Sequence, residues 1–128
     1  RKRSSAASDV YKRQIMNDGL AENVRRLTPY FEAHMRRLLE HPNIGEARGK
    51  GLMGALEAVQ DKSNKTPFAA NLSVSERIAN TCTDHGLICR PLGQSIVLCP
   101  SFIFTENHID EMFEKLECAL KQVFAEIA

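Results

Sequence analysis

The stretch Gly86-Leu-Ile-Cys-Arg-Pro-Leu-Gly-Gln-Ser-Ile-Val-Leu-Cys99 decides how the second half of the chain folds. It contains two short apolar runs, 87–90 and 95–99, which are separated by Pro91-Leu-Gly-Gln94. Two apolar runs joined by a few residues rich in proline and glycine are typical of a β-hairpin. We therefore predict strands over Leu87–Arg90 and Ser95–Cys99. Pro91 should end the first strand, because proline cannot donate to a ladder.

A helix is expected on each side of this hairpin. Upstream, Ser73-Val-Ser-Glu76 has the Ser-x-x-Glu form of a capping box, and Gly86 suits the left-handed end of the same helix. Downstream, Thr105 can cap a final helix. Apolar residues recur along that helix at helical spacing, namely Ile109, Met112, Phe113, Leu116, Leu120, Val123, Phe124 and Ile127.

The first half of the chain predicts one more helix and one more strand. Apolar residues recur every three or four positions over 20–38, where Pro29 should kink or restart the helix, and His41-Pro42-Asn43 should end it. The run Leu52–Val59 predicts a strand, and the polar segment 61–68 a loop. The order helix, strand, helix, strand, strand, helix predicts an α/β (α+β) fold. Its three-stranded, largely antiparallel sheet would be covered by helices on one face.

Composition narrows the class of protein. The chain has 128 residues and 14.3 kDa, with 43% hydrophobic and 26% charged residues, as expected of one folded domain. No apolar run approaches the ~20 residues that a membrane-spanning helix needs, and no signal-peptide pattern is present. The four cysteines (Cys82, Cys89, Cys99 and Cys118) form no Cys-x-x-Cys pair. We therefore expect free thiols and a cytoplasmic protein.

Residues 1–14 differ from the rest of the chain. They carry five basic residues and one acidic residue around a Ser-Ser-Ala-Ala-Ser centre, with no helical periodicity. The string Ser4-Ser-Ala-Ala-Ser-Asp-Val-Tyr-Lys-Arg-Gln14 resembles translated linker sequence from shotgun assemblies, so we expect a non-native or disordered tail. The alternative is a basic arm that binds nucleic acid or an anionic membrane. We expect neither partner, because only charge supports that alternative.

Few residues are candidates for chemistry. The four histidines show no metal-ligand spacing. The segment Gly45-Glu-Ala-Arg-Gly-Lys-Gly51 departs from a Walker A loop, because three residues rather than four separate its first two glycines and glycine follows the lysine. Arg90, beside the rigid Pro91, could present its planar fork to a carboxylate. From the residues alone, a solvated arginine or a structural ion pair is the favoured interpretation.

Three motifs together resemble one enzyme family. They are GEARGKGLMGALEAV (45–59), DKSNKTPF (61–68) and GLICRPLGQSIVLCPSFIFTENHIDEMF (86–113). With the final helix, they are similar to the C-terminal small domain of class III, pyridoxal-phosphate-dependent aminotransferases of fold type I, and most similar to the amine:pyruvate type. The resemblance implies that 44–128 form the small domain and 15–43 a connecting helix region. One departure is Cys99-Pro100-Ser101, where the family usually has Cys-Pro-Pro.

The resemblance also implies a function for named residues. Arg90 would bind the substrate carboxylate and move aside for an apolar amine, and Leu92 would line the substrate pocket. Pyridoxal 5'-phosphate, the Schiff-base lysine and every catalytic or cofactor-binding residue would belong to a large domain outside this sequence, so Lys50, Lys62 and Lys65 are not candidates. The parent would act on small amines and keto acids as a homodimer, and the chain alone would be inactive. The alternative is a standalone module that binds small carboxylates.

Overall fold

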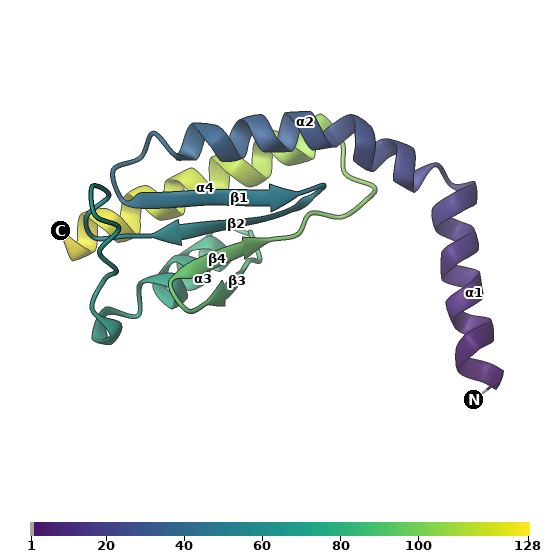
Figure 1. Ribbon diagram of the computed structural model, residues 1–128, viewed down its shortest axis with the longest axis horizontal. Coiled ribbons are helices and arrows are strands. Elements are labelled where there is room, and N and C mark those ends of the chain that lie inside the picture. The colour runs from purple at the N-terminus through teal and green to yellow at the C-terminus, as the bar shows by residue number, and fades with distance from the viewer. Residues whose placement is uncertain (1) are drawn as a thin grey trace.

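The computed structural model describes residues 2–128, and side chains from Ser5 onward. Four α-helices, four strands and one short 3-10 helix follow one another along the chain (Figure 1). In order they are α1 (Lys2–Asn17), α2 (Leu20–Leu38), β1 (Ile44–Lys50), β2 (Met53–Ala58), η1 (Ala70–Leu72), α3 (Val74–Asp84), β3 (Arg90–Leu92), β4 (Ser95–Leu98) and α4 (Glu106–Ile127).

The four strands form one antiparallel sheet in the order β1-β2-β4-β3. Along β2, Gly54, Leu56 and Ala58 are buried, whereas the alternate residues are exposed or half-buried. Since alternate side chains point to opposite faces of a sheet, one face is packed and the other is open. Figure 1 shows α3 and α4 behind the strands and α2 along the β1 side. The predicted α+β architecture, with helices on one face, is confirmed.

The expected number of strands was wrong, because Ile44–Lys50 forms a strand of its own. This segment has few apolar residues, so its sequence does not have the pattern of a buried strand. Its backbone nevertheless pairs with β2 from Ile44↔Ala58 to Lys50↔Met53, and Gly51-Leu52 connects the two strands as a turn. Backbone pairing at the edge of a sheet needs no continuous apolar run.

The boundaries of β3 also differ from the prediction, since Leu87–Cys89 lies outside the sheet and Pro91 lies inside it. The loop Gly93-Gln94 has two residues, so Leu92↔Ser95 is a hydrogen-bonded pair and Pro91↔Ile96 is a non-hydrogen-bonded one. The nitrogen of Pro91 therefore points away from β4. Because β3 is an edge strand, the missing N–H removes no ladder bond.

The helix boundaries follow the predicted ones closely, with two differences. Helix α2 runs through Pro29 without restarting. Ser73 is the N-cap of α3 as expected, but its backbone is left-handed and its side chain makes no capping hydrogen bond, so the predicted capping box is wrong. Thr105 caps α4 as predicted, and its box partner is His108, whose Nδ1 accepts from the Thr105 N–H at 3.0 Å.

Helix α2 packs closely against the covered face of the sheet at Gly54. A Cβ atom at this position would lie 2.8 Å from Met35 Cε and 3.0 Å from two ring atoms of Phe31. Only a residue without a side chain permits this approach. The core between sheet and helices includes Leu27, Phe31, Leu56, Ile78, Ile96, Leu98, Ile109, Phe113, Leu116 and Leu120, all at most 1% exposed.

Residues 2–17 form helix α1, although the sequence of residues 1–14 shows no helical periodicity. Its described side chains, from Ser5 onward, are all exposed. Because no described side chain of this helix is buried, the helix has no apolar stripe that sequence periodicity could reveal. The expectation that residues 1–14 are foreign to the protein stays a prediction. In the described part of the chain, no helix has the length and apolar character needed to cross a membrane.

Candidate functional site

The open face of the sheet carries both residues that the sequence singled out. Arg90 and Leu92 are two positions apart on β3, so their side chains share a face. The register places Arg90 beside Val97, Val97 beside Ala55, and Ala55 beside Arg48. Ala55 alternates with the buried residues of β2, which assigns this whole row to the open face.

Arg90 differs from the other arginine of this row in having a free guanidinium. Among the described residues, the Arg90 side chain has no hydrogen-bond or ion-pair partner, and it is exposed. Arg48 instead contacts Glu46 at 3.1 Å and Glu57 at 3.7 Å. The structural ion pair that the sequence left open for Arg90 is therefore not formed within the described chain, and its exposed side chain matches the other alternative, a solvated arginine. A free planar fork on an open face can bind a carboxylate through two parallel hydrogen bonds.

Arg48 has a structural task of its own. Glu46 and Glu57 lie directly opposite each other in the β1–β2 ladder. Like charges at directly opposed positions destabilise a sheet. The Arg48 guanidinium lies close to both carboxylates and offsets their repulsion, which explains why it is not available to a ligand.

Small and apolar side chains lie between the two arginines. Neighbouring strands are about 4.8 Å apart, so β1 and β3, three steps apart, are separated by roughly 14 Å. Ala55 and Val97 fill the space between, and Met53 is 60% exposed beside them. A shallow depression of about 360 Å³ lies over this region, and Leu92, at 61% exposed, lies beyond Arg90 on β3. Among the described residues, the face therefore combines two unpaired cations, the Arg90 guanidinium and the Lys50 ammonium on β1, with apolar surface.

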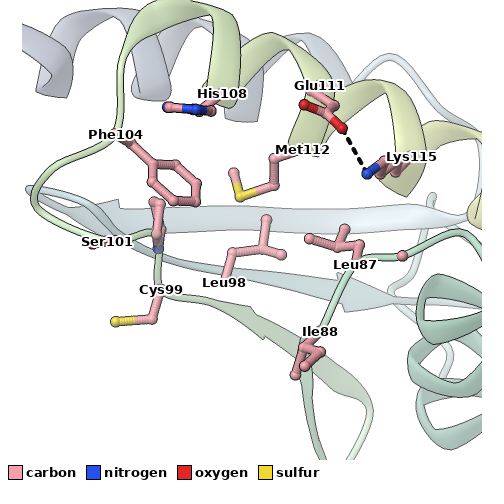
Figure 2. A pocket seen from close by; sticks show the side chains of 12 residues that line it. Leu87, Ile88, Leu98, Cys99, Ser101, Phe104, His108, Glu111, Met112 and Lys115 are labelled. Carbon is pink, nitrogen blue, oxygen red and sulfur yellow. Dashed lines mark ion pairs between the residues drawn. The ribbon is translucent and has the colours of Figure 1, made fainter.

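A second hollow, of about 280 Å³, lies where β4 ends and α4 begins. Figure 2 shows Phe104, Leu98 and Met112 around it, with the Glu111–Lys115 ion pair above. The two charged groups of that pair are 2.7 Å apart. Leu98 is a buried residue of the covered face, so this hollow is separate from the face that carries Arg90.

The described residues do not fit pyridoxal phosphate as a complete site. That cofactor needs a lysine amine for a Schiff base and an acidic or basic partner for its ring nitrogen. Lys115, which lines the hollow of Figure 2, is held by Glu111, and His108 beside it caps α4. The ammonium of Lys62 donates to the carbonyls of Leu39 and His41. Within residues 5–128, no three His, Cys, Asp or Glu side chains gather to hold a metal ion.

The family model of the class III aminotransferases, "Aminotransferase class-III", matches residues 4–120. The chain belongs to this family. Class III aminotransferases are pyridoxal-phosphate enzymes, and the solved structures that this chain resembles include PMP-bound and PLP-bound forms. The matched residues include all four strands of the sheet and helix α4 as far as residue 120.

Two solved aminotransferases are similar to this chain over most of its length. A PMP-bound aminotransferase from Vibrio fluvialis is 70% identical with a TM-score of 0.89, over 91% of this chain and 26% of its own. An ω-aminotransferase from Paracoccus denitrificans is 73% identical with a TM-score of 0.89, over the same shares. Among curated proteins, the uncharacterized aminotransferase y4uB of Sinorhizobium fredii is 33% identical over 96% of this chain and 27% of its own length. The chain thus spans about a quarter of its relatives.

Reasoning from the class III sequence alone identified Arg90 and Leu92 but not the surface around them. It missed Arg48, Met53, Ala55 and Val97, which share the open face. Alternation along β2 was a usable signal for Met53 and Ala55. The position of Arg48 depends on pairing between β1 and β2, and this segment was not expected to be a strand.

Proposed function

We propose that this chain is the C-terminal part of an ω-aminotransferase that moves an amino group from a primary amine or amino acid to pyruvate. The observation that carries the proposal is the free guanidinium of Arg90 on an open, partly apolar face. Its support from relatives is the 73% identity to the Paracoccus denitrificans ω-aminotransferase. A putrescine–pyruvate aminotransferase of Pseudomonas aeruginosa is also 30% identical over 90% of this chain.

In this proposal the chain binds and orients the substrate. Arg90 pairs with the carboxylate of a keto acid or amino acid, and two parallel N–H···O bonds fix its orientation. Leu92 and the apolar strip formed by Ala55 and Val97 contact the non-polar part of the substrate. When an apolar amine replaces the carboxylate, the long Arg90 side chain turns toward solvent without any movement of β3. Pyridoxal phosphate supplies an electron sink, and residues outside this sequence hold it.

The proposal extends to assembly and location. The parent acts in the cytoplasm as a homodimer on small amines and keto acids, with no role for nucleic acid or membrane. The four cysteines are free in the described structure, which suits a reducing compartment.

The test compares two arginines of the same row in the full-length protein that contains this sequence. Arg90→Ala should lower kcat/KM for pyruvate by roughly 10- to 100-fold, because it removes a charge-assisted pair worth about 1.5–3 kcal/mol. It should leave kcat/KM for an amine without a carboxylate within about threefold. Arg90→Lys keeps the charge but loses the fork, so its effect should be intermediate.

Arg48→Ala is the matched control, because it removes the same charge from the opposite edge of the same face. It should leave the discrimination between pyruvate and amine unchanged. An equal loss for both substrates in Arg90→Ala would contradict a carboxylate-binding role. The 128-residue chain alone should show neither transamination with added pyridoxal phosphate nor calorimetric binding of pyruvate. Binding of pyruvate without turnover would instead favour the standalone carboxylate-binding module.

A further inference from the structure

Two thiols face each other beneath the strand that carries Arg90. Cys82 lies in the last turn of α3 and is completely buried, and Cys89 is half-buried one residue before β3 begins. Cys82 belongs to the buried core and Cys89 packs against that core, and the two side chains lie close enough for a hydrogen bond between them to shift the pKa of each thiol. They are seven positions apart, Cys82 in the helix and Cys89 in the segment that connects it to β3.

The end of α3 explains this contact. Gly86 has a φ of +83°, and the chain reverses there. The N–H of Leu87 donates to the carbonyl of Cys82 at 2.8 Å, and the N–H of Gly86 donates to that of Thr83 at 2.9 Å. These two bonds form a Schellman motif, which fixes the path of the chain just past the helix. The segment that carries Cys89 is thereby returned alongside Cys82.

Burial gives the same placement. Cys89 is half-buried and packs against the core, whereas the adjacent Arg90 is exposed on the open face, so Cys89 lies toward the side on which the helices pack. At the other end of β3, Ser75 of α3 donates from its hydroxyl to the carbonyl of Gly93 at 2.6 Å. Helix α3 therefore lies beneath β3 along its whole length, and the Cys82–Cys89 contact marks one end of this interface.

The two thiols lie in different environments, which give them different reactivity toward oxidants. The hydrogen bond from Cys82 lowers the pKa of Cys89, despite some desolvation. The same hydrogen bond, together with burial, raises the pKa of Cys82. Cys89 is thus the partner that ionises more readily and that solvent can reach, and ionised, accessible thiols are those that oxidants attack.

We propose that Cys82 and Cys89 form a site of reversible oxidation, which hydrogen peroxide converts to an intrachain disulfide. The Cys89 thiolate attacks the peroxide, the O–O bond breaks, and Cys89 becomes a sulfenic acid while hydroxide leaves. The Cys82 sulfur then attacks the sulfenic sulfur, the S–O bond breaks, and its oxygen leaves as water once the thiol proton is transferred. The two sulfurs give up two electrons in total, and peroxide is reduced to two waters.

The second step is favoured by the loss of charge in the first. Cys82 resists ionisation chiefly because it donates its proton to the Cys89 thiolate. A sulfenic acid has no such negative charge, so the main cause of that resistance disappears as soon as Cys89 is oxidised. The sulfurs then need to close to the S–S bond length of about 2.05 Å. The disulfide would fasten the residue before Arg90 to α3, and its formation does not depend on the proposed function.

The test uses the folded chain with the exposed thiols removed, as the double variant Cys99→Ser and Cys118→Ser. After peroxide treatment and quenching, the denatured protein should show no titratable thiol and a mass lower by about 2 Da, both restored by dithiothreitol. Cleavage before aspartates, including Asp84, should release peptides 61–83 and 84–109 joined to each other. The same protein before treatment should give them separately.

A matched control keeps two thiols but not this pair, by replacing Cys89 and Cys118 with serine instead. Cys82 and Cys99 should then remain free of an intrachain disulfide at the same dose. Three outcomes would overturn the proposal: disulfide-linked dimers only, conversion of Cys89 to a sulfinic acid with Cys82 still free, or no loss of thiol at a dose that oxidises Cys99 in the unaltered chain.

Discussion

Replacing Gly54 by valine should destabilise the chain strongly. The Cβ alone would lie 2.8 Å from Met35 Cε and 3.0 Å from the Phe31 ring, and valine adds two further methyl groups. Phe31 is completely buried, so it has no room to withdraw. Overpacking of this kind costs about 1–3 kcal/mol. With three added carbons against a buried ring, we expect a loss near the upper end, about 3 kcal/mol.

Urea unfolding followed by circular dichroism measures this loss. For a slope of about 2 kcal/mol/M, the unfolding midpoint should fall by about 1.5 M. Ala55→Val is the matched control, because the neighbouring residue points to the open face and valine suits a strand. Its midpoint should stay within about 0.3 M of the unaltered chain.

A double variant isolates the packing contact itself. Met35→Ala alone should cost about 2–4 kcal/mol, because it leaves a cavity beside Phe31. Combined with Gly54→Val, it should cost at least about 1 kcal/mol less than the sum of the two single losses, since valine occupies the space that Met35 vacates. Simple additivity, or a Gly54→Val midpoint equal to that of Ala55→Val, would refute the close approach of α2 to β2.

Three further perturbations test the helices. Thr105→Ala should lower the free energy of unfolding by about 1 kcal/mol because α4 loses its N-cap, whereas Thr105→Ser should not, as chemical denaturation will show. Pro29→Ala should raise the free energy of unfolding by about 1–3 kcal/mol, because Pro29 is exposed inside α2 and alanine restores a helical N–H. A variant less stable than the unaltered chain would mean that proline is needed at this position. The hydrogen bond from Tyr30, followed by His34, lowers the pKa of Asp110, so this carboxylate stabilises the fold above about pH 4 and loses that effect as the pH falls through its folded pKa. Tyr30→Phe should therefore be less stable at pH 7, and its deficit should shrink at pH 3; a deficit independent of pH would contradict this.

Much of the fold could be predicted because burial leaves a periodic pattern. The stripe of α4, the strand 53–58 and the left-handed end of α3 at Gly86 were all visible as residue types at characteristic spacings. Strand β1 was not visible in this way, since Glu46, Arg48 and Lys50 point to the open face. This segment is a strand because its backbone pairs with β2, not because it contains an apolar run. The sequence predicted that a strand ends before Pro91, and this was wrong. Whether a proline nitrogen faces the neighbouring strand depends on the hairpin register, which the sequence alone does not show.

The site was predictable to a similar degree. Arg90 and Leu92 were identified through a resemblance to class III aminotransferases, and the register then placed them on one face. That Arg48 is already paired while Arg90 is free depends on side chains from three strands. No linear motif contains that information, because the distinction arises only when β1 and β2 bring Glu46 and Glu57 together.

The outward-pointing nitrogen of Pro91 has a consequence for self-association. An unpaired strand edge is a template on which another chain can add a strand and begin an aggregate. At the β3 edge, the template is only three residues long and lacks one of its outward donors. Leu92 and Met53 are exposed on the open face, but the β3 edge is therefore a poor template for the addition of another strand.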